Sequence, residues 1–245
     1  MVSVEIPQIS QNAGRDQDET AAVHLWRVPL DGPFDAGILS PDERERAARF
    51  RVPLLHDRYC AGRCALRVIL GRYLNTPPQS IAFEYNEHGK PLLGLSIHFN
   101  LSHAGSQMLL GATRERMIGV DIETRNRRTE SESIARRFFS PHEVEQLMTY
   151  PIHERGAAFL RCWVRKEAYV KAIGTGIGGG LQNFAVSLAD SAVTPMLWAP
   201  NQAGDWTFYD VDMGPEFVAS AALTSNPCDL RIFDYQSPLT FHPAL

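Results

Sequence analysis

No stretch of this sequence approaches the roughly 20 consecutive apolar residues that a membrane-spanning helix requires. The N-terminus also lacks the basic start and apolar core of a secretion signal. Hydrophobic residues make up 44% of the 245 residues and charged residues 21%, the balance of an ordinary globular protein. We therefore expect a soluble, cytoplasmic protein with no membrane partner, built as one large domain or as two domains of about 120 residues.

Cysteine is scarce, and none of the four cysteines forms a Cys-x-x-Cys pair; they are Cys60, Cys64, Cys162 and Cys228. Cys60 and Cys64 lie four residues apart, a same-face spacing on a helix, but two thiols alone would leave a structural zinc site incomplete. Because disulfides are rare in the reducing cytosol, we expect buried free thiols.

Basic residues are not in excess. The formal net charge is −4 and the pI about 6.1, whereas nucleic-acid-binding proteins are usually basic, so we expect no nucleic-acid partner. Seven arginines nevertheless crowd residues 114–137, namely Arg114, Arg116, Arg125, Arg127, Arg128, Arg136 and Arg137. They either belong to solvated helix faces and loops or form a docking surface for an acidic partner.

Local patterns predict mixed α and β structure. Strands are expected near 22–28, 81–85, 97–101, 108–112, 117–123, 184–188, 206–211 and 217–223. Helices are expected from Pro41 onward and near 57–74, 133–139, 141–149 and 154–173. The last of these helices ends at the glycine-rich run 174–180, which a helix does not tolerate. Residues 1–20 are polar with little periodicity, and we expect them to be disordered.

The two halves of the chain resemble each other. Ser40-Pro41-x-Glu43 recurs 100 residues later as Ser140-Pro141-x-Glu143, and residues 63–67 recur 98 residues later as 161–165. Residues 105–112 have a looser echo in 214–221. Chance similarity of short motifs is the alternative, but the constant order favours a duplicated unit. We predict two similar α+β halves, 21–115 and 116–245, related by a pseudo-twofold axis with a cleft at their seam.

Two acidic residues, Asp121 and Glu123, lie two apart in a strand pattern and therefore share one face. Like charges in such a position repel unless a cation lies between them. Magnesium takes oxygen ligands and is commonly held by few carboxylates plus phosphates. The alternative is a solvated strand edge with two acids.

The long helix carries Trp163, Glu167 and Lys171 at spacings of four, so they form one stripe. Glu167 is a candidate third metal ligand and Lys171 a candidate cation for a phosphate. A surface Glu–Lys pair beside a core Trp is the alternative.

Ser102 and His103 follow a strand, where a hydroxyl, an imidazole and loop amides together suit a phosphate. A hydrolase nucleophile is disfavoured, because Gly-x-Ser-x-Gly is absent and adjacent strand residues point apart. Lys90 is a further cation, on a rigid turn between Gly89 and Pro91.

These motifs in this order resemble those of the 4'-phosphopantetheinyl transferases in their long, Sfp-type form. The similar segments are Gly89-Lys90-Pro91, Phe99-Asn100-Leu101-Ser102-His103, Gly119-Val120-Asp121-Ile122-Glu123 and Trp163-x-x-Lys166-Glu167-Ala168-x-x-Lys171. The resemblance spans about 24–190. It implies a pseudo-dimer of two α+β halves with the active site in the seam, in agreement with the internal repeat.

The resemblance implies the activity as well. Such a holo-[acyl-carrier-protein] synthase type enzyme moves the 4'-phosphopantetheine arm of coenzyme A onto a serine of an acyl or peptidyl carrier protein and releases 3',5'-ADP. It serves peptide synthetases and polyketide or fatty-acid synthases, as in secondary metabolite biosynthesis. We expect a monomer.

By the same resemblance Asp121, Glu123 and Glu167 hold Mg2+. Glu143 is implied as general base, with Glu167 and Lys171 as the other catalytic residues. The residues implied to bind coenzyme A are Arg46, Arg58, Gly89, Lys90, Pro91, Asn100, Ser102, His103, Asp121 and Lys171. One departure is Glu43, which stands where some relatives carry a lysine, so that the phosphate contact there is either weaker or shared by Arg44 and Arg49.

Two other classes of function remain open. A magnesium-dependent phosphohydrolase or nucleotidyl transferase would explain the carboxylates, but not the set of cations across both halves. A non-catalytic module that binds acidic carrier domains would not need the three carboxylates.

Overall fold

The computed structural model describes residues 22–87, 89–94, 97–126, 130–176, 180–199, 206–224 and 230–236. The predicted disorder of residues 1–20 falls outside these ranges, as do Arg127, Arg128 and Cys228. Cys60, Cys64 and Cys162 are buried free thiols. Burial raises the pKa of Cys64 to about 12, so this thiol is protonated and unreactive at neutral pH.

The first half of the chain builds one sheet with two helices beside it. Its elements are β1 (Val23–Pro29), η1 (Ala36–Ile38), α2 (Pro41–Ala47), α3 (Pro53–Leu74), η2 (Pro78–Ser80), β2 (Glu84–Tyr85), β3 (Pro91–Leu92), β4 (His98–Ala104) and β5 (Gln107–Thr113). Helix α2 begins where predicted, because Ser40 and Glu43 form a capping box and Pro41 occupies the first turn.

The chain from residue 116 onward repeats this plan with more helices. Its elements are β6 (Ile118–Thr124), α4 (Ser131–Phe138), α5 (Pro141–Thr149), α6 (Ile152–Ile173), η4 (Leu181–Asn183), β7 (Ala185–Val186), β8 (Val193–Trp198), β9 (Trp206–Asp210), β10 (Phe217–Thr224) and β11 (Leu230–Asp234). Ser140 and Glu143 form the same capping box at the start of α5.

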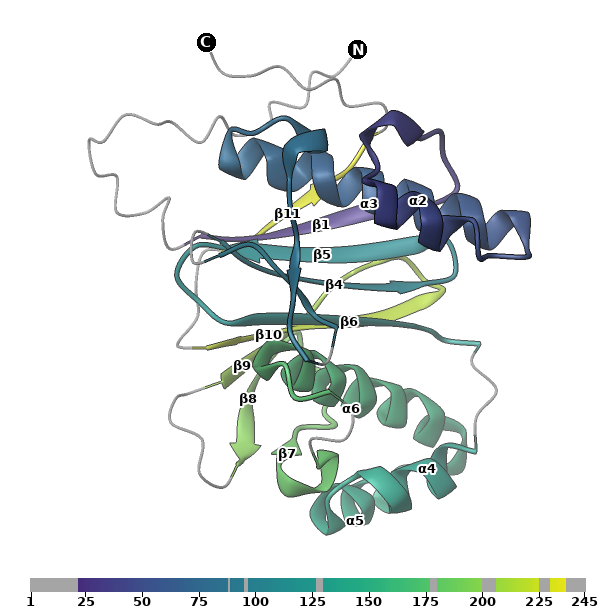
Figure 1. The fold of residues 1–245 in the computed structure, drawn as a ribbon. Helices are drawn as coiled ribbons and strands as arrows, with labels where there is room; N and C mark the ends of the chain where they lie inside the picture. Colours follow the sequence, from purple (N-terminus) through teal and green to yellow (C-terminus); the bar gives the residue numbers. More distant parts are fainter. Residues whose placement is uncertain are drawn as a thin grey trace, which may run out of the picture.

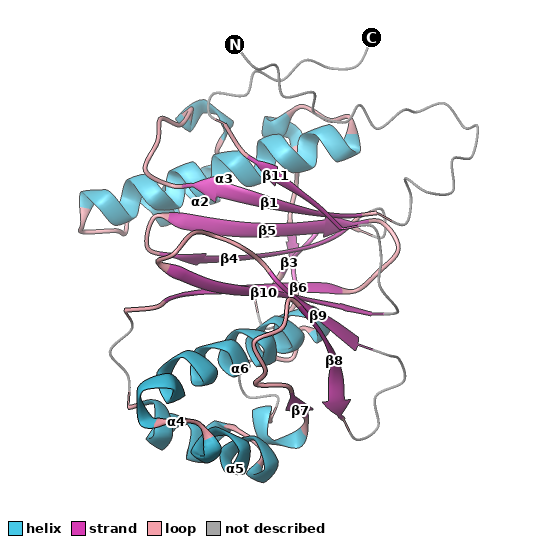
Figure 2. Cartoon of the chain, turned by 180° about the vertical axis from the view of Figure 1, so that it is seen from behind, coloured by secondary structure: helices cyan, strands magenta, loops and turns pink. Residues whose placement is uncertain are grey.

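The helices and sheets lie in layers. The strand order is β11-β1-β5-β4 in the first large sheet and β6-β10-β9-β8-β7 in the second, and β2 and β3 form a separate two-stranded sheet. Figure 1 shows α3 outside the first sheet, the two sheets in the middle and α6 outside the second, and Figure 2 shows the same order from behind. Apolar side chains of β1, β5, β6, β9 and β10 form a shared core between the sheets. The predicted α+β fold with two similar halves is confirmed.

Helices α3 and α6 correspond at an offset of 99, since their first residues are 53 and 152 and their last residues 74 and 173. Each ends at a left-handed residue, Asn75 or Gly174. The predicted match of residues 63–67 with 161–165, at an offset of 98, is therefore out of register by one. Lys166 occupies the position in α6 that Arg67 occupies in α3. Each of these cations pairs with the glutamate of the capping box in its own half.

The C-terminal strand does not belong to the second half. Strand β11 pairs in parallel with β1, from Val23–Leu230 to Arg27–Asp234. The predicted assignment of all residues from 116 onward to the C-terminal half is therefore wrong for residues 230–234. No helix in the described ranges is long and apolar enough to cross a membrane.

Candidate active site

Strand β6 presents two different faces. Val120 and Ile122 point into the core between the sheets, so Asp121 and Glu123 lie on the opposite face with Gly119. That face meets helix α6. A Cβ atom on Gly119 would overlap the backbone oxygen of Ala168 and the backbone nitrogen of Ala172. The missing side chain therefore lets α6 approach the backbone of the strand.

The close approach brings three predicted site residues together. The Lys171 ammonium lies 2.6 Å from Oδ1 of Asp121 and donates to Oγ of Ser102 at 2.7 Å. The Ser102 hydroxyl donates to the same Oδ1 at 2.9 Å. Asp121 is 4% and Ser102 6% exposed, whereas the Lys171 side chain is 30% exposed. We call this group the Ser102–Asp121–Lys171 cluster; it joins β4 of one half to β6 and α6 of the other.

The other two predicted metal ligands flank this cluster. Glu167 is buried on α6, one turn before Lys171, and Glu123 is half-buried on β6. Among the described residues, no three His, Cys, Asp or Glu side chains form an arrangement ready to hold a metal ion. The stripe predicted on the helix is present, with Trp163 packed on Phe159 and Phe138 in the core.

Asn100 and His103 lie on β4, the strand that carries Ser102 of the cluster. The amide oxygen of Asn100 accepts a hydrogen bond from the Val120 backbone at 2.8 Å and so ties β4 to β6. His103 keeps an exposed edge, while the protein atoms packed around the rest of its ring, together with the nearby Lys171 charge, lower its pKa. His103 is therefore neutral at pH 7.

Lys90 contacts the end of α6. Its ammonium donates to the backbone oxygens of Lys171 at 2.7 Å and Ala172 at 3.0 Å. Gly89 supplies a left-handed residue with φ 77° in the turn before it, and Pro91 begins β3. The predicted turn is present.

Glu143 lies apart from solvent. It is 0% exposed, and Lys166 donates to both of its carboxylate oxygens at 2.7 Å. The backbone amides of Val186 and Ser140 also donate to it. In this position the carboxylate is a buried ion-pair partner that joins α5 to α6, and it is not accessible to an incoming hydroxyl.

The basic residues of the first half lie on its helical layer. Arg46 is exposed on α2 and lies over the Tyr59 ring, and Arg58 pairs with Asp31. Glu43, the residue that departs from the family pattern, is buried and pairs with Arg63 and Arg67. Glu43 therefore forms ion pairs within the first half.

The described arginines of the stretch 114–137 do not form one surface. Arg114 and Arg116 precede β6 and donate to the backbone oxygens of Tyr73 and Thr224. Arg125, Arg136 and Arg137 follow the other end of this seven-residue strand and are exposed. A strand of that length separates its two ends by about 20 Å, so the single docking surface predicted over 114–137 is divided into two.

Sequence reasoning missed two buried cations on α6. Lys166 pairs with Glu143, while Arg165 donates to the backbone oxygens of Ser187, Ala189 and Ser191 and pairs with Asp210. The recurrence of a Ser-Pro-x-Glu capping box ahead of a basic helix was the signal that could have found Lys166.

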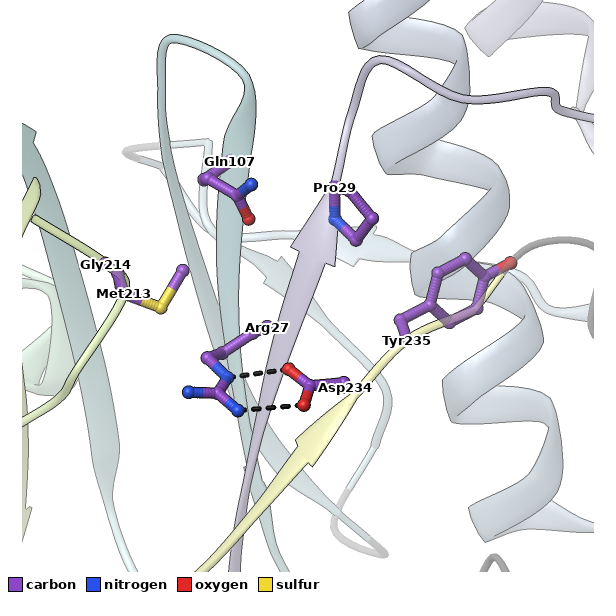
Figure 3. Close-up of a pocket in the computed structure, with 7 residues that line it drawn as sticks. All are labelled: Arg27, Pro29, Gln107, Met213, Gly214, Asp234 and Tyr235. Atoms are coloured by element: carbon purple, nitrogen blue, oxygen red, sulfur yellow. Dashed lines mark hydrogen bonds and ion pairs between the residues drawn. The ribbon is translucent and has the colours of Figure 1, made fainter. Parts of the chain in front are cut away.

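A separate cavity of about 310 Å3 lies between the halves. Figure 3 shows the seven residues that line it, with the ion pair of Arg27 and Asp234 at one side; the others are Pro29, Gln107, Met213, Gly214 and Tyr235. None of these seven residues is a predicted site residue. The Arg27 guanidinium and the Asp234 carboxylate at this cavity already hydrogen-bond to each other.

Comparison with known proteins gives two adjoining family matches. Residues 117–222 match the 4'-phosphopantetheinyl transferase superfamily, and residues 32–115 match the 4'-phosphopantetheinyl transferase N-terminal family. The chain is 38% identical over 211 residues to the 4'-phosphopantetheinyl transferase HetI of Nostoc sp., covering 82% of this chain and 87% of the relative. It is 30% identical over 225 residues to the 4'-phosphopantetheinyl transferase Sfp of Bacillus subtilis, covering 88% and 99%.

Proposed function

The chain belongs to the 4'-phosphopantetheinyl transferase superfamily, and from this we propose that it transfers the 4'-phosphopantetheine arm of coenzyme A to a serine of an acyl or peptidyl carrier protein. Apo carrier becomes holo carrier and 3',5'-ADP is released. The observation that carries the assignment of the site is the Ser102–Asp121–Lys171 cluster, in which side chains of both halves meet. No comparison favours a phosphohydrolase or a nucleotidyl transferase.

Mg2+ is the metal that the family implies, and the residues of the cluster fit it. No described residue donates a hydrogen bond to the buried Oδ2 of Asp121, while Oδ1 already faces a cation, the Lys171 ammonium. Proteins commonly bind Mg2+ through one or two carboxylates plus substrate phosphates and water, so a complete set of protein ligands is not needed. We propose Asp121, Glu123 and Glu167 as the residues that hold it. When bound, the ion would withdraw charge from the pyrophosphate of coenzyme A.

The transfer exchanges one phosphorus–oxygen bond for another. The carrier serine oxygen bonds to the β-phosphorus, the bond from that phosphorus to the bridging oxygen breaks, and the electron pair leaves with 3',5'-ADP. Lys171, the most exposed member of the cluster, is placed to neutralise the charge that grows on the leaving phosphate. Ser102 holds this ammonium on Asp121, and we propose that Ser102, His103, Arg46 and Arg58 serve the coenzyme side.

The serine proton needs an acceptor. The burial of Glu143 and its pairing with Lys166 argue against the role implied by the resemblance. Glu167 is 5% exposed, but it lies on the helix face that carries Lys171, beside the cluster, so we propose that it accepts the proton as well as holding the metal.

The acidic carrier partner needs a basic surface. Arg125, Arg136 and Arg137 are exposed beyond the end of β6, so we propose that the carrier docks there. We further propose a monomeric, cytoplasmic enzyme with no nucleic-acid or membrane partner.

The test is a transfer assay with coenzyme A, Mg2+ and an apo carrier domain, read by mass spectrometry. The carrier should gain about 340 Da, the mass of the arm. Asp121→Asn should lower the rate about 100-fold or more, because the metal and Lys171 contacts are worth several kcal/mol. Asp190→Asn, which changes a carboxylate that is 88% exposed, is the matched control and should keep the wild-type rate.

The same assay separates the alternatives. A wild-type rate in Asp121→Asn would sink the site assignment, and cleavage of coenzyme A without carrier modification would favour a phosphohydrolase. Raising salt should increase KM for the carrier more than KM for coenzyme A, since exposed charges are screened. Equal increases would remove the proposed docking surface.

A further inference from the structure

A hairpin of the N-terminal half holds the end of a C-terminal helix. Strands β2 and β3 form this hairpin, and Lys90 in its turn donates to the backbone oxygens of Lys171 and Ala172 at 2.7 and 3.0 Å. The Asn86 side chain accepts from the Lys90 backbone at 2.8 Å and donates to the Gly174 oxygen at 3.4 Å. We call Asn86 and Lys90 the hairpin clamp.

The carbonyls at this helix end require partners. The last four backbone carbonyls of a helix find no hydrogen-bond donor within the helix, and they carry the negative end of the helix dipole. Gly174 adopts φ 76° and ends the helix, so continuation of α6 cannot supply the missing donors. A half-buried ammonium placed there satisfies two carbonyls and complements the dipole. Burial lowers the pKa of Lys90.

The clamped turn carries Lys171. The backbone oxygen of Lys171 accepts from Lys90, while its side chain contacts Asp121 at 2.6 Å and Ser102 at 2.7 Å. Fixing the backbone of this residue therefore fixes the origin of the side chain that reaches the cluster. The clamp comes from the opposite half, so it also couples the two halves at the site.

The distribution of lysine agrees with a specialised role. The sequence contains lysine at positions 90, 166 and 171 only. Two of these are on α6, and the third caps it. Lysine offers a compact ammonium with three donors, which suits converging carbonyl oxygens.

We propose that Lys90 is a positioning residue, which holds the last turn of α6 and thereby sets Lys171 against Asp121, and that it does not act by binding a phosphate of coenzyme A. The proposal rests on the function assigned above to Lys171. Its structural part does not, because the clamp can be measured in the protein without coenzyme A.

The first measurement is hydrogen–deuterium exchange of the free protein. Lys90→Met keeps the length of the side chain and removes the ammonium. It should speed exchange of amides near the end of α6, residues 168–174, about tenfold or more, and leave residues 155–162 unchanged. Lys90→Arg should restore most of the protection, because a guanidinium also donates to two oxygens. Unchanged exchange at 168–174 in Lys90→Met would overturn the clamp.

The second measurement is steady-state transfer kinetics. Lys90→Met should lower kcat about ten- to a hundredfold through misplacement of Lys171, with KM for coenzyme A changed less than about twofold. Lys90→Arg should recover most of kcat. A raised KM at normal kcat would instead identify Lys90 as a phosphate ligand and refute the positioning role.

Arg114→Met provides the matched control. Arg114 donates to the Tyr73 backbone oxygen at 2.9 Å, near the end of α3, the helix that corresponds to α6. This variant removes an equivalent contact in the other half, so exchange at 168–174 and kcat should stay at wild-type values. If wild type transfers nothing to any carrier, the proposed function fails, while the exchange data still decide the clamp.

Discussion

At position 119 the absence of a side chain decides how closely α6 approaches the strand that carries Asp121. A Cβ atom there would overlap backbone atoms of Ala168 and Ala172 and lie 2.9 Å from the Ala172 Cα. Backbone atoms of a packed helix cannot move aside as the end of a flexible side chain does. Glu167 and Lys171 lie on the same helix face, so their placement depends on this one position.

We predict that Gly119→Ala lowers the free energy of unfolding by about 3 kcal/mol, at the upper end of overpacking costs. It should also reduce transfer beyond what the loss of folded protein explains, because α6 shifts away from Asp121. Chemical denaturation and the transfer assay measure the two effects.

Gly156→Ala, on helix α6, is the control for this change on strand β6. Gly156 is exposed, and a Cβ atom there meets no atom within 4 Å, so this change should stabilise the protein by up to about 1 kcal/mol. Equal stability of both variants would show that Gly119 does not set the spacing.

Residue patterns predicted part of the site. The period of two placed Asp121 and Glu123 on one face, and the period of four placed Glu167 and Lys171 on one stripe. Neither period says which residue of another element lies opposite, so the contacts of Ser102 with Asp121 and of Lys90 with α6 were not predictable. The partners of Glu143 were hidden for the same reason.

At the scale of elements, Glu143 belongs to the junction of α5 and α6. It completes the capping box of α5 and pairs with Lys166, which also donates to the Phe184 backbone oxygen. Glu43 makes the same kind of junction between α2 and α3 through Arg67. The repetition of this pair in both halves, of which only one carries Asp121 and Lys171, indicates a structural role.

We predict that Glu143→Gln costs about 3–5 kcal/mol of stability, because it leaves the Lys166 ammonium buried without a counter-charge. The folded fraction should keep the pH profile of wild-type kcat. Glu145→Gln, an exposed change on the same helix, should alter neither property. A stable Glu143→Gln enzyme whose kcat no longer falls at acid pH would return the base role to Glu143.

Element prediction succeeded where local signals are strong. The starts of α2 and α5 follow from Ser-Pro and the capping boxes. Strand β8 was missed because Pro195 lies within it, and proline argues against a strand. Strand β11 was missed because its partner is a parallel strand about 200 residues earlier, where Arg27 meets Asp234 at a separation of 207.

At the scale of the molecule, duplication produced two halves but one site. Strand β1 pairs with β5 as β6 pairs with β10, antiparallel in both cases. The side chains of β1 that pack with α3 include Trp26 and Val28, where β6 carries acids toward α6, and the helix offset of 99 makes Val68 the counterpart of Glu167. An indole and an aliphatic chain cannot coordinate a metal ion, so these positions of the first half do not repeat the acidic groups of the second.

The first half is instead completed by β11. Phe233 stacks on Trp26 with ring centroids 4.8 Å apart, and Tyr235 is buried with its backbone nitrogen donating to the Arg27 oxygen. Asp234 accepts from Arg27 at 2.7 and 2.8 Å. Without this strand, β1 would be an edge with unpaired backbone groups beside exposed aromatic surface.

We therefore predict that a variant ending at residue 229 loses about 3–5 kcal/mol of stability from the aromatic burial alone and aggregates as its concentration rises. A variant ending at residue 236 retains every described contact of β11 and should match wild type. Thermal unfolding, with light scattering at two concentrations, measures both. Strand β11 begins beyond the second half and pairs with the first. Equal stability of the two truncations would therefore mean that the first half folds without help from the C-terminal end, and its dependence on β11 would have to be rejected.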